Sequence, residues 1–234
     1  MPLIVFDLDG TLIDSQRDIA ESTNEMLESY GVRPRPIEEV TGMVGEGAKV
    51  LVARALAAAG LDRQAQVQVQ VDDALERFLA IYNRRLLKHT LPYPGIPDVL
   101  QRAAARASLA VLSNKPEAPT RRLLEAFDLS RHFGWVMGGD AAFPRKPDPA
   151  GLRHLIDAAG ETAASTLFVG DSMIDVETAR AARVRIAVVL FGFGARRGDM
   201  VLRPEESTAA DVAALSAAIE RFLTTAPGGT SHLH

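Results

Sequence analysis

Five short apolar runs, none interrupted by a charged residue, constrain the fold of this chain more than any other feature. An uninterrupted run of this length is typical of a parallel strand that is buried on both faces. Segments with helical spacing of apolar residues lie between the runs. This alternation predicts an α/β fold, a doubly wound and mostly parallel sheet with helices on both faces. The expected strands are Leu3–Phe6, Leu109–Leu112, Trp135–Met137, Leu167–Val169 and Ile186–Phe191, and the expected helices are Pro97–Ala107, Ala118–Phe127, Pro149–Ala159, Met173–Ala182 and Ala209–Leu223.

One long segment between the first and second runs shows helical signals and no convincing strand. Ser15 can cap a first helix and Gly31 can follow its end. A second helix is expected from Gly47 to Ala59, and a third carries apolar residues at helical spacing from Val71 onward. We therefore expect a helical cap, residues 15–90, inserted into an α/β core of residues 1–14 and 91–226. Residues 227–234 are expected to form a disordered tail.

The composition narrows the class of protein. The chain has 234 residues, no cysteine and a formal net charge of −4. The lack of cysteine excludes thiol catalysis, disulfides and cysteine-bound metals, and a nucleic-acid binder usually carries a basic surplus. No apolar stretch approaches the roughly 18 residues of a membrane span, and the first residues do not resemble a signal peptide. We expect a cytoplasmic protein, monomeric or homodimeric, with no nucleic-acid or membrane partner.

The motif Asp7-Leu8-Asp9-Gly10-Thr11 directly follows the first expected strand. Two carboxylates two residues apart point the same way while the chain is extended, and Gly10 lets the backbone turn and approach a ligand. Ligands of open parallel sheets collect at the carboxyl ends of the strands. The like charges of Asp7 and Asp9 need a cation, a proton or both. The motif therefore indicates a binding site, although a single Asp at a strand end is commonly part of a turn.

A second group of acids follows the fourth run. Gly170-Asp171-Ser172 comes directly after it, and Asp175 lies at the start of the next helix. Taken alone, Asp175 could be a helix cap or a partner of the helix dipole. Together with Asp7 and Asp9, these acids form an oxygen-only ligand set, which suits Mg²⁺. The sequence therefore predicts that four acidic side chains from distant parts of the chain gather around one divalent cation.

Two further segments carry residues that suit a phosphate. Ser113-Asn114-Lys115 follows the second run, where a hydroxyl and backbone N–H groups can hold phosphate oxygens. A plain Ser-Asn turn is the alternative. Lys146 lies in a loop that Pro147 and Pro149 stiffen, and a lysine so presented can act as a point charge on phosphate. Most lysines are simply solvated, which is the alternative for Lys146.

In this order, the Asp7–Thr11 segment, Ser113, Lys146 and the pair Asp171 and Asp175 resemble the four motifs of the haloacid dehalogenase superfamily. The match spans the whole expected core, and the helical insertion resembles that superfamily's small all-helical cap. Within the superfamily, residues 7–15 followed by residues 41–48 most resemble the bacterial phosphoglycolate phosphatases. The second acid at Asp9 favours phosphoryl transfer, because the superfamily's dehalogenases lack it.

The resemblance implies a role for each residue. Asp7 would attack phosphorus and form an aspartyl-phosphate, and Asp9 would protonate the leaving oxygen and later deprotonate the attacking water. Asp7, the backbone carbonyl of Asp9, and Asp171 would hold Mg²⁺. Nearby supporting residues would be Ser172 and Asp175. The expected phosphate-binding residues are Gly10, Thr11, Ser113, Asn114 and Lys146.

The reaction that the resemblance implies is Mg²⁺-dependent hydrolysis of a small phosphomonoester, with 2-phosphoglycolate as the best match. A phosphomutase or a sugar-phosphate phosphatase on the same core stays open. A non-catalytic phosphate-binding module is a remote alternative, because it would be expected to lack Asp7 or Asp9. Substrate choice is expected in the cap. There, Gly45 lies in a loop that could approach the site, and Lys49 and Arg54 could meet a substrate carboxylate, although both could equally be solvated helix charges.

Overall fold

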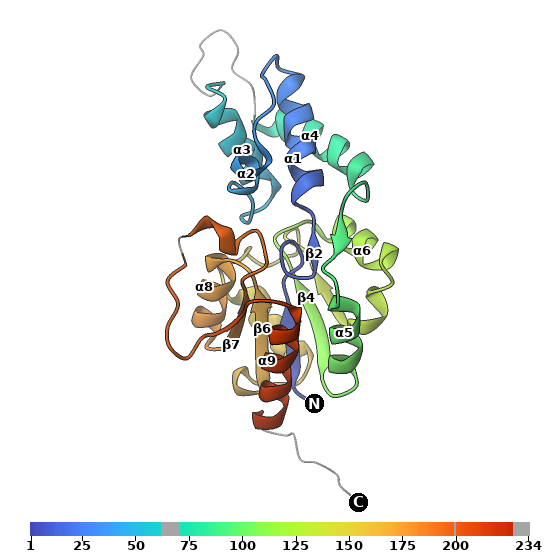
Figure 1. Ribbon diagram of the computed structural model, residues 1–234, viewed down its shortest axis with the longest axis vertical. Helices are drawn as coiled ribbons and strands as arrows, with labels where there is room; N and C mark the ends of the chain where they lie inside the picture. Colours follow the sequence, from blue (N-terminus) through green and yellow to red (C-terminus); the bar gives the residue numbers. More distant parts are fainter. Residues whose placement is uncertain (62–70, 199, 227–234) are drawn as a thin grey trace, which may run out of the picture.

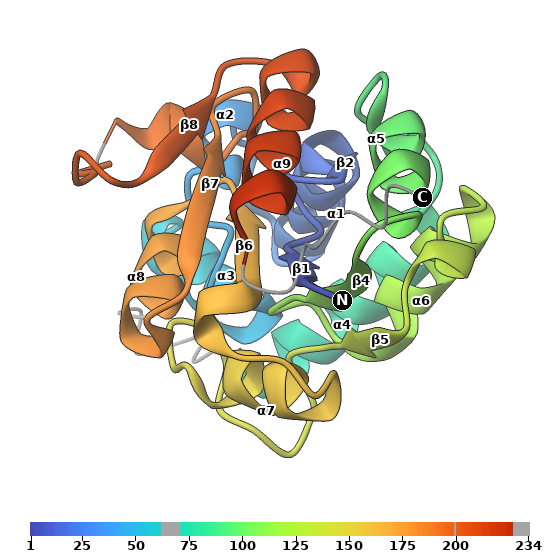
Figure 2. The same ribbon diagram turned by 90° about the horizontal axis from the view of Figure 1, so that it is seen from below.

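The computed structural model describes residues 1–61, 71–198 and 200–226. A six-stranded sheet lies at its centre, with strand order β5-β4-β1-β6-β7-β8 and all neighbours parallel (Figures 1 and 2). The strands are β1 (Leu3–Phe6), β4 (Ser108–Leu112), β5 (Trp135–Met137), β6 (Thr166–Gly170), β7 (Arg185–Val189) and β8 (Ser207–Ala209). The five expected strands are all present, and the predicted doubly wound α/β fold is confirmed.

Both faces of the sheet are covered by helices. Ile4 and Phe6 of β1 belong to an apolar cluster with α5 (Ile96–Ala104), α6 (Glu117–Ala126) and α9 (Val212–Thr225). Leu3 and Val5 belong to a second cluster with α7 (Ala150–Ala158) and α8 (Met173–Ala182). Successive strand residues point to opposite faces, so a strand buried on both faces must be apolar throughout. This is why the strands appear in the sequence as uninterrupted runs.

The described part of the segment inserted after β1 contains four helices, which lie beyond the carboxyl ends of the strands (Figure 1). They are α1 (Gln16–Glu28), α2 (Ile37–Thr41), α3 (Ala48–Ala58) and α4 (Val71–Arg85). The two connecting segments pair as an antiparallel ribbon of β2 (Ile13–Asp14) and β3 (Leu91–Pro92). We propose that this ribbon marks the boundary between cap and core.

A buried carboxylate ties the entry and exit of the insertion together. Asp18, in the first turn of α1, accepts hydrogen bonds from the backbone N–H groups of His89 and Thr90, both at 2.8 Å. The hydroxyl of Thr90 donates to the same carboxylate oxygen at 2.7 Å. The start of α1 is thereby fixed to the segment that returns to the core.

The short elements differ from the sequence analysis. The pattern does not predict β2, β3, β8 or α2. Strands β2 and β3 have only two residues each, β8 (Ser-Thr-Ala) has a single apolar residue, and α2 has only five residues. Ala209 ends β8, and the last helix begins only at Val212, after Asp211 accepts a hydrogen bond from the N–H of Ala214. The fifth expected strand ends at Val189 and not at Phe191. Three short 3₁₀ helices complete the described elements: η1 (Ser130–His132), η2 (Ala163–Ser165) and η3 (Ala195–Arg197).

The sequence also predicts a disordered C-terminal tail and no membrane span. The expected tail, residues 227–234, lies outside the described residues. Among the described helices, none has the length and apolar character needed to cross a membrane.

Candidate active site

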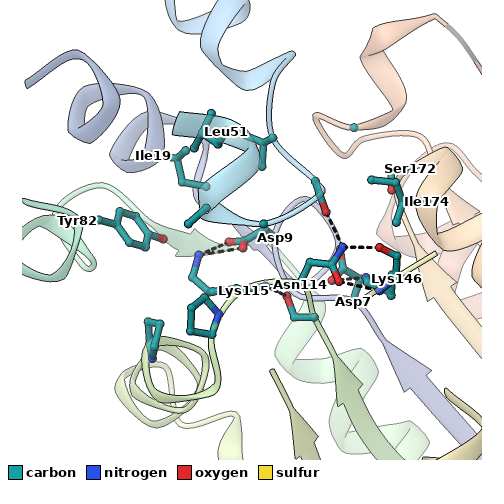
Figure 3. A pocket seen from close by; sticks show the side chains of 18 of the residues that line it. Asp7, Asp9, Ile19, Leu51, Tyr82, Asn114, Lys115, Lys146, Ser172 and Ile174 are labelled. Atoms are coloured by element: carbon teal, nitrogen blue, oxygen red, sulfur yellow. Dashed lines mark hydrogen bonds and ion pairs between the residues drawn. The ribbon is translucent and has the colours of Figure 1, made fainter. Parts of the chain in front are cut away.

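The register of the sheet brings three strand ends to one edge. Phe6 pairs with Val111 of β4 and with Val169 of β6, so Asp7 lies level with the last residues of both neighbours. Ser113 and Asp171 directly follow those last residues. The edge borders a cavity of about 210 Å³, whose lining includes Ser113 and Asp171. Asp7, Asp9 and Lys146 also line it (Figure 3). Residues far apart in sequence therefore share one cavity wall, as the strand ends predict.

Three buried carboxylates meet at this edge. Asp7, Asp171 and Asp175 each offer an oxygen that lies within 4.8 Å of the other two. Burial raises the pKa of Asp7 from its ordinary 3.8 to about 6, although the attraction of Lys146 opposes the shift. Burial, together with the charges of Asp175 and Asp7, also raises the pKa of Asp171. A divalent cation would relieve this excess of negative charge, so the cluster is consistent with a metal site.

Lys146 joins two of these acids. Its Nζ atom lies 2.8 Å from Oδ1 of Asp7 and 2.6 Å from Oδ1 of Asp175. Burial opposes the charge of Lys146, but the two carboxylates outweigh it and hold the pKa of this lysine above its usual range. The ammonium group is therefore a fixed positive charge beside Asp7, suited to the oxygens of a phosphate group.

Both carboxylate oxygens of Asp175 already have partners in the protein. Its Oδ2 atom accepts hydrogen bonds from the backbone N–H groups of Asp171 and Ser172, and from the Ser172 hydroxyl at 2.7 Å. Ser172 is the N-cap of α8, and the two side chains form a capping box there. Asp175 thus orients Lys146 and Asp171 and has less capacity to bind a metal directly.

The side chain of Asp9 turns away from the three carboxylates, which corrects the expectation of four acids in one group. Its Oδ1 atom accepts a hydrogen bond from the Ser15 hydroxyl at 2.5 Å. Nζ of Lys115 lies 2.8 Å from its Oδ2 atom (Figure 3). A donor and a cation attract Asp9 to this side, whereas the other side already holds three carboxylates. Ser15 precedes α1 as expected, but its hydroxyl serves Asp9 and makes no capping bond.

The side-chain amide of Asn114 forms its hydrogen bonds with the protein itself. Its Nδ2 atom donates to the carbonyl of Gly45 at 2.8 Å and to that of Lys146 at 2.9 Å, and its Oδ1 atom accepts from the N–H of Lys146. The side chain therefore has a structural role, and a phosphate contact of Asn114 through its backbone N–H group stays a prediction. Asn114 joins the end of β4, the Lys146 loop and the cap.

Gly10 and Thr11 are not among the described residues that line the cavity, in contrast to their expected phosphate contact. Their N–H groups donate within the turn, to the carbonyls of Ile13 and Leu8 respectively. Gly10 has φ +87°, and a Cβ atom there would overlap the carboxylate of Asp171. The backbone N–H groups of the two residues hold the turn together. The missing side chain of Gly10 lets the Asp171 carboxylate lie against that turn.

Of the three cap residues expected to contact the substrate, one lines the cavity and two do not. Gly45 lines the cavity. Lys49 instead pairs with Asp72 at 2.7 Å on the surface, and Arg54 pairs with Glu46. Neither Lys49 nor Arg54 is among the described lining residues, so the expectation that they meet a substrate is not supported by their positions. Both charges are satisfied by acids of the cap itself.

Several lining residues escaped the sequence analysis: Ile19, Leu51, Phe78, Tyr82 and Lys115. Phe78 and Tyr82 are four residues apart on α4, a spacing that also describes an ordinary core face. Lys115 directly follows Ser113 and Asn114, which is the signal that could have revealed it. Apolar lining comes from α1, α3 and α4 and also from Ile174 of α8 and Phe193, and the charged lining comes from the strand ends and from the loop that carries Lys146.

Comparison with known proteins agrees with this geometry. The sequence model of the family described as haloacid dehalogenase-like hydrolase matches residues 4–189. A phosphoglycolate phosphatase of Pseudomonas fluorescens is 42% identical over 192 residues, which cover 82% of this chain and 70% of that protein. One from Rhodospirillum rubrum is 44% identical over 192 residues, covering 81% of this chain and 80% of that protein.

A solved structure has a similar fold over most of the chain. The crystal structure of a predicted phosphoglycolate phosphatase from Haemophilus somnus has a TM-score of 0.84 and 28% sequence identity, and the match covers 93% of this chain and 97% of that chain. The resemblance that the four motifs indicate is confirmed, and with it the expectation of a hydrolase. This chain belongs to the haloacid dehalogenase-like hydrolase family.

Proposed function

We propose that this chain is a Mg²⁺-dependent phosphatase that hydrolyses 2-phosphoglycolate to glycolate and phosphate. The observation that carries the proposal is the contact between Asp7 and Lys146, beside Asp171, on the wall of the cavity. A carboxylate nucleophile, a cation for phosphate oxygens and acids for a metal are what phosphoryl transfer through an aspartate requires. The relatives named phosphoglycolate phosphatase support a phosphoric monoester hydrolase and suggest this substrate.

The reaction proceeds in two steps. In the first, an oxygen of Asp7 attacks phosphorus, the bond from phosphorus to the ester oxygen breaks, and Asp9, which must enter this step carrying a proton, gives that proton to the departing oxygen. In the second, Asp9 takes a proton from water, whose oxygen attacks phosphorus and releases phosphate from Asp7. Lys146 and Ser113 stabilise the non-bridging oxygens. The hydrogen bond from Ser15 and the contact with Lys115 support the role of Asp9, because they hold it on the cavity wall.

The donor set fits Mg²⁺. Asp7, Asp171 and the backbone carbonyl of Asp9 would hold the ion, and Ser172 and Asp175 would support Asp171 and Lys146. Three buried carboxylates lie together with one lysine, so negative charge remains uncompensated. Oxygen ligands and excess negative charge favour a hard divalent cation. When bound, the ion supplies neutralisation of the phosphate and carboxylate charges.

The inserted helices cover the cavity. Ile19 of α1, Leu51 of α3 and Phe78 of α4 line it opposite the strand ends. We propose that this apolar cap excludes bulk water while the phosphoryl group moves to Asp7, which strengthens the interactions of the charged residues beneath it.

Phosphate release from purified protein tests the proposal. With Mg²⁺ present, 2-phosphoglycolate should be hydrolysed faster than other small phosphomonoesters, and EDTA should abolish the activity. Asp7→Asn should be inactive, whereas Asp98→Asn, an exposed acid in the first turn of α5, should match the wild type. No phosphate from any member of a broad phosphomonoester panel would overturn the proposal.

Phosphorus NMR separates hydrolysis from the alternatives. A phosphatase yields inorganic phosphate, whereas a phosphomutase yields an isomer of the starting phosphomonoester. Beryllofluoride, which mimics a phosphoryl group on aspartate, should stabilise the protein against heat only with Mg²⁺ and only when Asp7 is present. Equal stabilisation of Asp7→Asn would contradict the assignment of the nucleophile.

A further inference from the structure

The lysine that follows Asn114 lies between the core and the cap. The Lys115 side chain is only 6% exposed, and its Nζ atom contacts the Asp9 carboxylate at 2.8 and 3.1 Å. The same atom lies 4.6 Å from the centre of the Tyr82 ring on α4. The ammonium group therefore touches an acid of the core and an aromatic ring of the cap, at the wall of the cavity (Figure 3).

Tyr82 brings an unused hydrogen-bond donor to the same place. The residue is 4% exposed and lines the cavity, its hydroxyl oxygen faces the ammonium group of Lys115, and no described residue accepts a hydrogen bond from its hydroxyl group. Burial raises the pKa of Tyr82 to about 12, so the hydroxyl stays protonated near neutral pH. A buried hydroxyl hydrogen without an acceptor is unfavourable, and an acceptor on a bound ligand would satisfy it.

The two lysines of the cavity differ in how their charge is balanced. Lys146 lies between two carboxylates, Asp7 and Asp175. Lys115 forms an ion pair with one, Asp9. An ammonium group carries three N–H donors, so Lys115 can contact a second carboxylate in the way that Lys146 does.

No other described residue lining this cavity is cationic. The cap side is mostly apolar, and Lys49 and Arg54 have their own acidic partners outside the cavity. A second anionic group on a substrate would therefore find its counter-charge at Lys115.

We propose that Lys115 and Tyr82 bind a carboxylate of the substrate, Lys115 through its charge and Tyr82 through its hydroxyl hydrogen bond. The inference rests on the proposed phosphatase function and gives its substrate class. The phosphate lies at Asp7 and the carboxylate beside Asp9, and the Cα atoms of these two residues can be at most about 7 Å apart. The substrate is therefore short, with the carboxylate one or two carbon atoms from the phosphate ester, as in 2-phosphoglycolate.

The test compares matched substrates. Ethyl phosphate replaces the carboxylate of 2-phosphoglycolate with a methyl group and keeps the ester. Tyr82→Phe keeps the ring that stacks on Phe78 and removes only the hydroxyl. We expect this variant to lower kcat/KM for 2-phosphoglycolate about tenfold and to leave ethyl phosphate unchanged. Tyr93→Phe, which removes another unpartnered hydroxyl away from the cavity lining, should change neither substrate.

Lys115→Met gives a second measurement. It should slow both substrates, because Asp9 loses its cation, but should slow 2-phosphoglycolate more. A role confined to positioning Asp9 would slow both equally. Calorimetric binding with Mg²⁺ gives a readout without turnover, using 3-phosphonopropionate, which carries the carboxylate, and propylphosphonate, which does not. The wild type should bind 3-phosphonopropionate more tightly than propylphosphonate. Both variants should lower the ratio of the two affinities.

The outcomes separate the two proposals. Hydrolysis of other phosphomonoesters without hydrolysis of 2-phosphoglycolate overturns the proposed substrate. A wild-type preference for 2-phosphoglycolate that Tyr82→Phe and Lys115→Met leave unchanged overturns the carboxylate site alone. If nothing is hydrolysed, the phosphatase proposal fails, and the ratio of phosphonate affinities still decides whether Lys115 and Tyr82 bind a carboxylate.

Discussion

The side-chain amide of Asn114 holds both backbone groups of Lys146. It accepts a hydrogen bond from the N–H of Lys146 at 2.9 Å and donates one to its carbonyl, also at 2.9 Å. The same amide nitrogen donates to the carbonyl of Gly45 in the cap. Because Lys146 contacts Asp7, one side chain fixes the lysine at the reacting carboxylate and attaches the cap loop beside it.

Asn114→Asp removes the donating half of this link. The acid has the same shape, but its second oxygen faces the carbonyl oxygens of Gly45 and Lys146. We expect a loss of about 1–3 kcal/mol in the free energy of unfolding and a fall in kcat of at least about tenfold, because Lys146 is displaced. Urea unfolding and phosphate release measure the two effects. Gln101→Glu, an exposed amide-to-acid change on α5, should alter neither, and wild-type behaviour of Asn114→Asp would refute the link.

Asp18 should matter for stability and not for chemistry. Asp18→Ala leaves the N–H groups of His89 and Thr90 and the Thr90 hydroxyl without their acceptor. Unsatisfied buried donors are costly, so we expect about 3 kcal/mol of lost stability in urea unfolding. Asp98→Ala on the surface of α5 is the control. A loss below about 0.5 kcal/mol, the usual range for a surface substitution, would show that this carboxylate does not hold the insertion.

The strand ends made much of the site predictable. Asp7 and Asp171 follow buried strands, and the parallel register alone brings them to one edge. The positions of these two acids needed only the order of strands and the chemistry of the residues that follow them. Lys146 is different, because its loop left a solvated lysine as an alternative, and only the resemblance to the haloacid dehalogenase superfamily assigned it to this edge.

The orientation of Asp9 needed the tertiary structure. In an extended chain its carboxylate points the same way as that of Asp7, but Ser15 and Lys115 attract it to the other side. Tyr82 gave no sequence signal, because a ring at helical spacing describes a buried helix face equally well. Strand β8 is Ser-Thr-Ala, with a single apolar residue, so it forms no apolar run of the kind that revealed the other strands of the sheet.

Gly10 is required by the approach of Asp171. Its φ of +87° disfavours other residues, and a Cβ atom there would overlap the Asp171 carboxylate. Gly31 has a similar φ of +76°, but a Cβ atom there would meet nothing within 4 Å. Gly31→Ala should cost about 1 kcal/mol in thermal or urea unfolding, whereas Gly10→Ala should cost more and abolish phosphate release. Similar effects of the two substitutions would contradict the role of the Asp171 contact.

Stability without metal should fall as pH rises through the range in which Asp7 ionises. Folding raises the pKa of Asp7 from 3.8 to about 6, so the folded state holds this proton more tightly than the unfolded chain. The resulting stabilisation is complete below pH 3.8, and it is lost as pH rises through about 6, with a total of about 3 kcal/mol. Burial shifts the pKa of Asp171 in the same direction.

Thermal unfolding in EDTA between pH 5 and 7 checks this prediction, with Asp7→Asn as the matched control. His132, whose pKa burial lowers, makes stability rise over the same range, so the informative quantity is the difference between wild type and variant. The lowered pKa values of Glu21, Glu25 and Glu206 act below pH 4.5, outside this window. The wild type should lose stability relative to Asp7→Asn as pH rises, and Mg²⁺ should restore it. A difference that stays constant with pH would mean that Asp7 ionises as freely in the folded protein as in the unfolded chain.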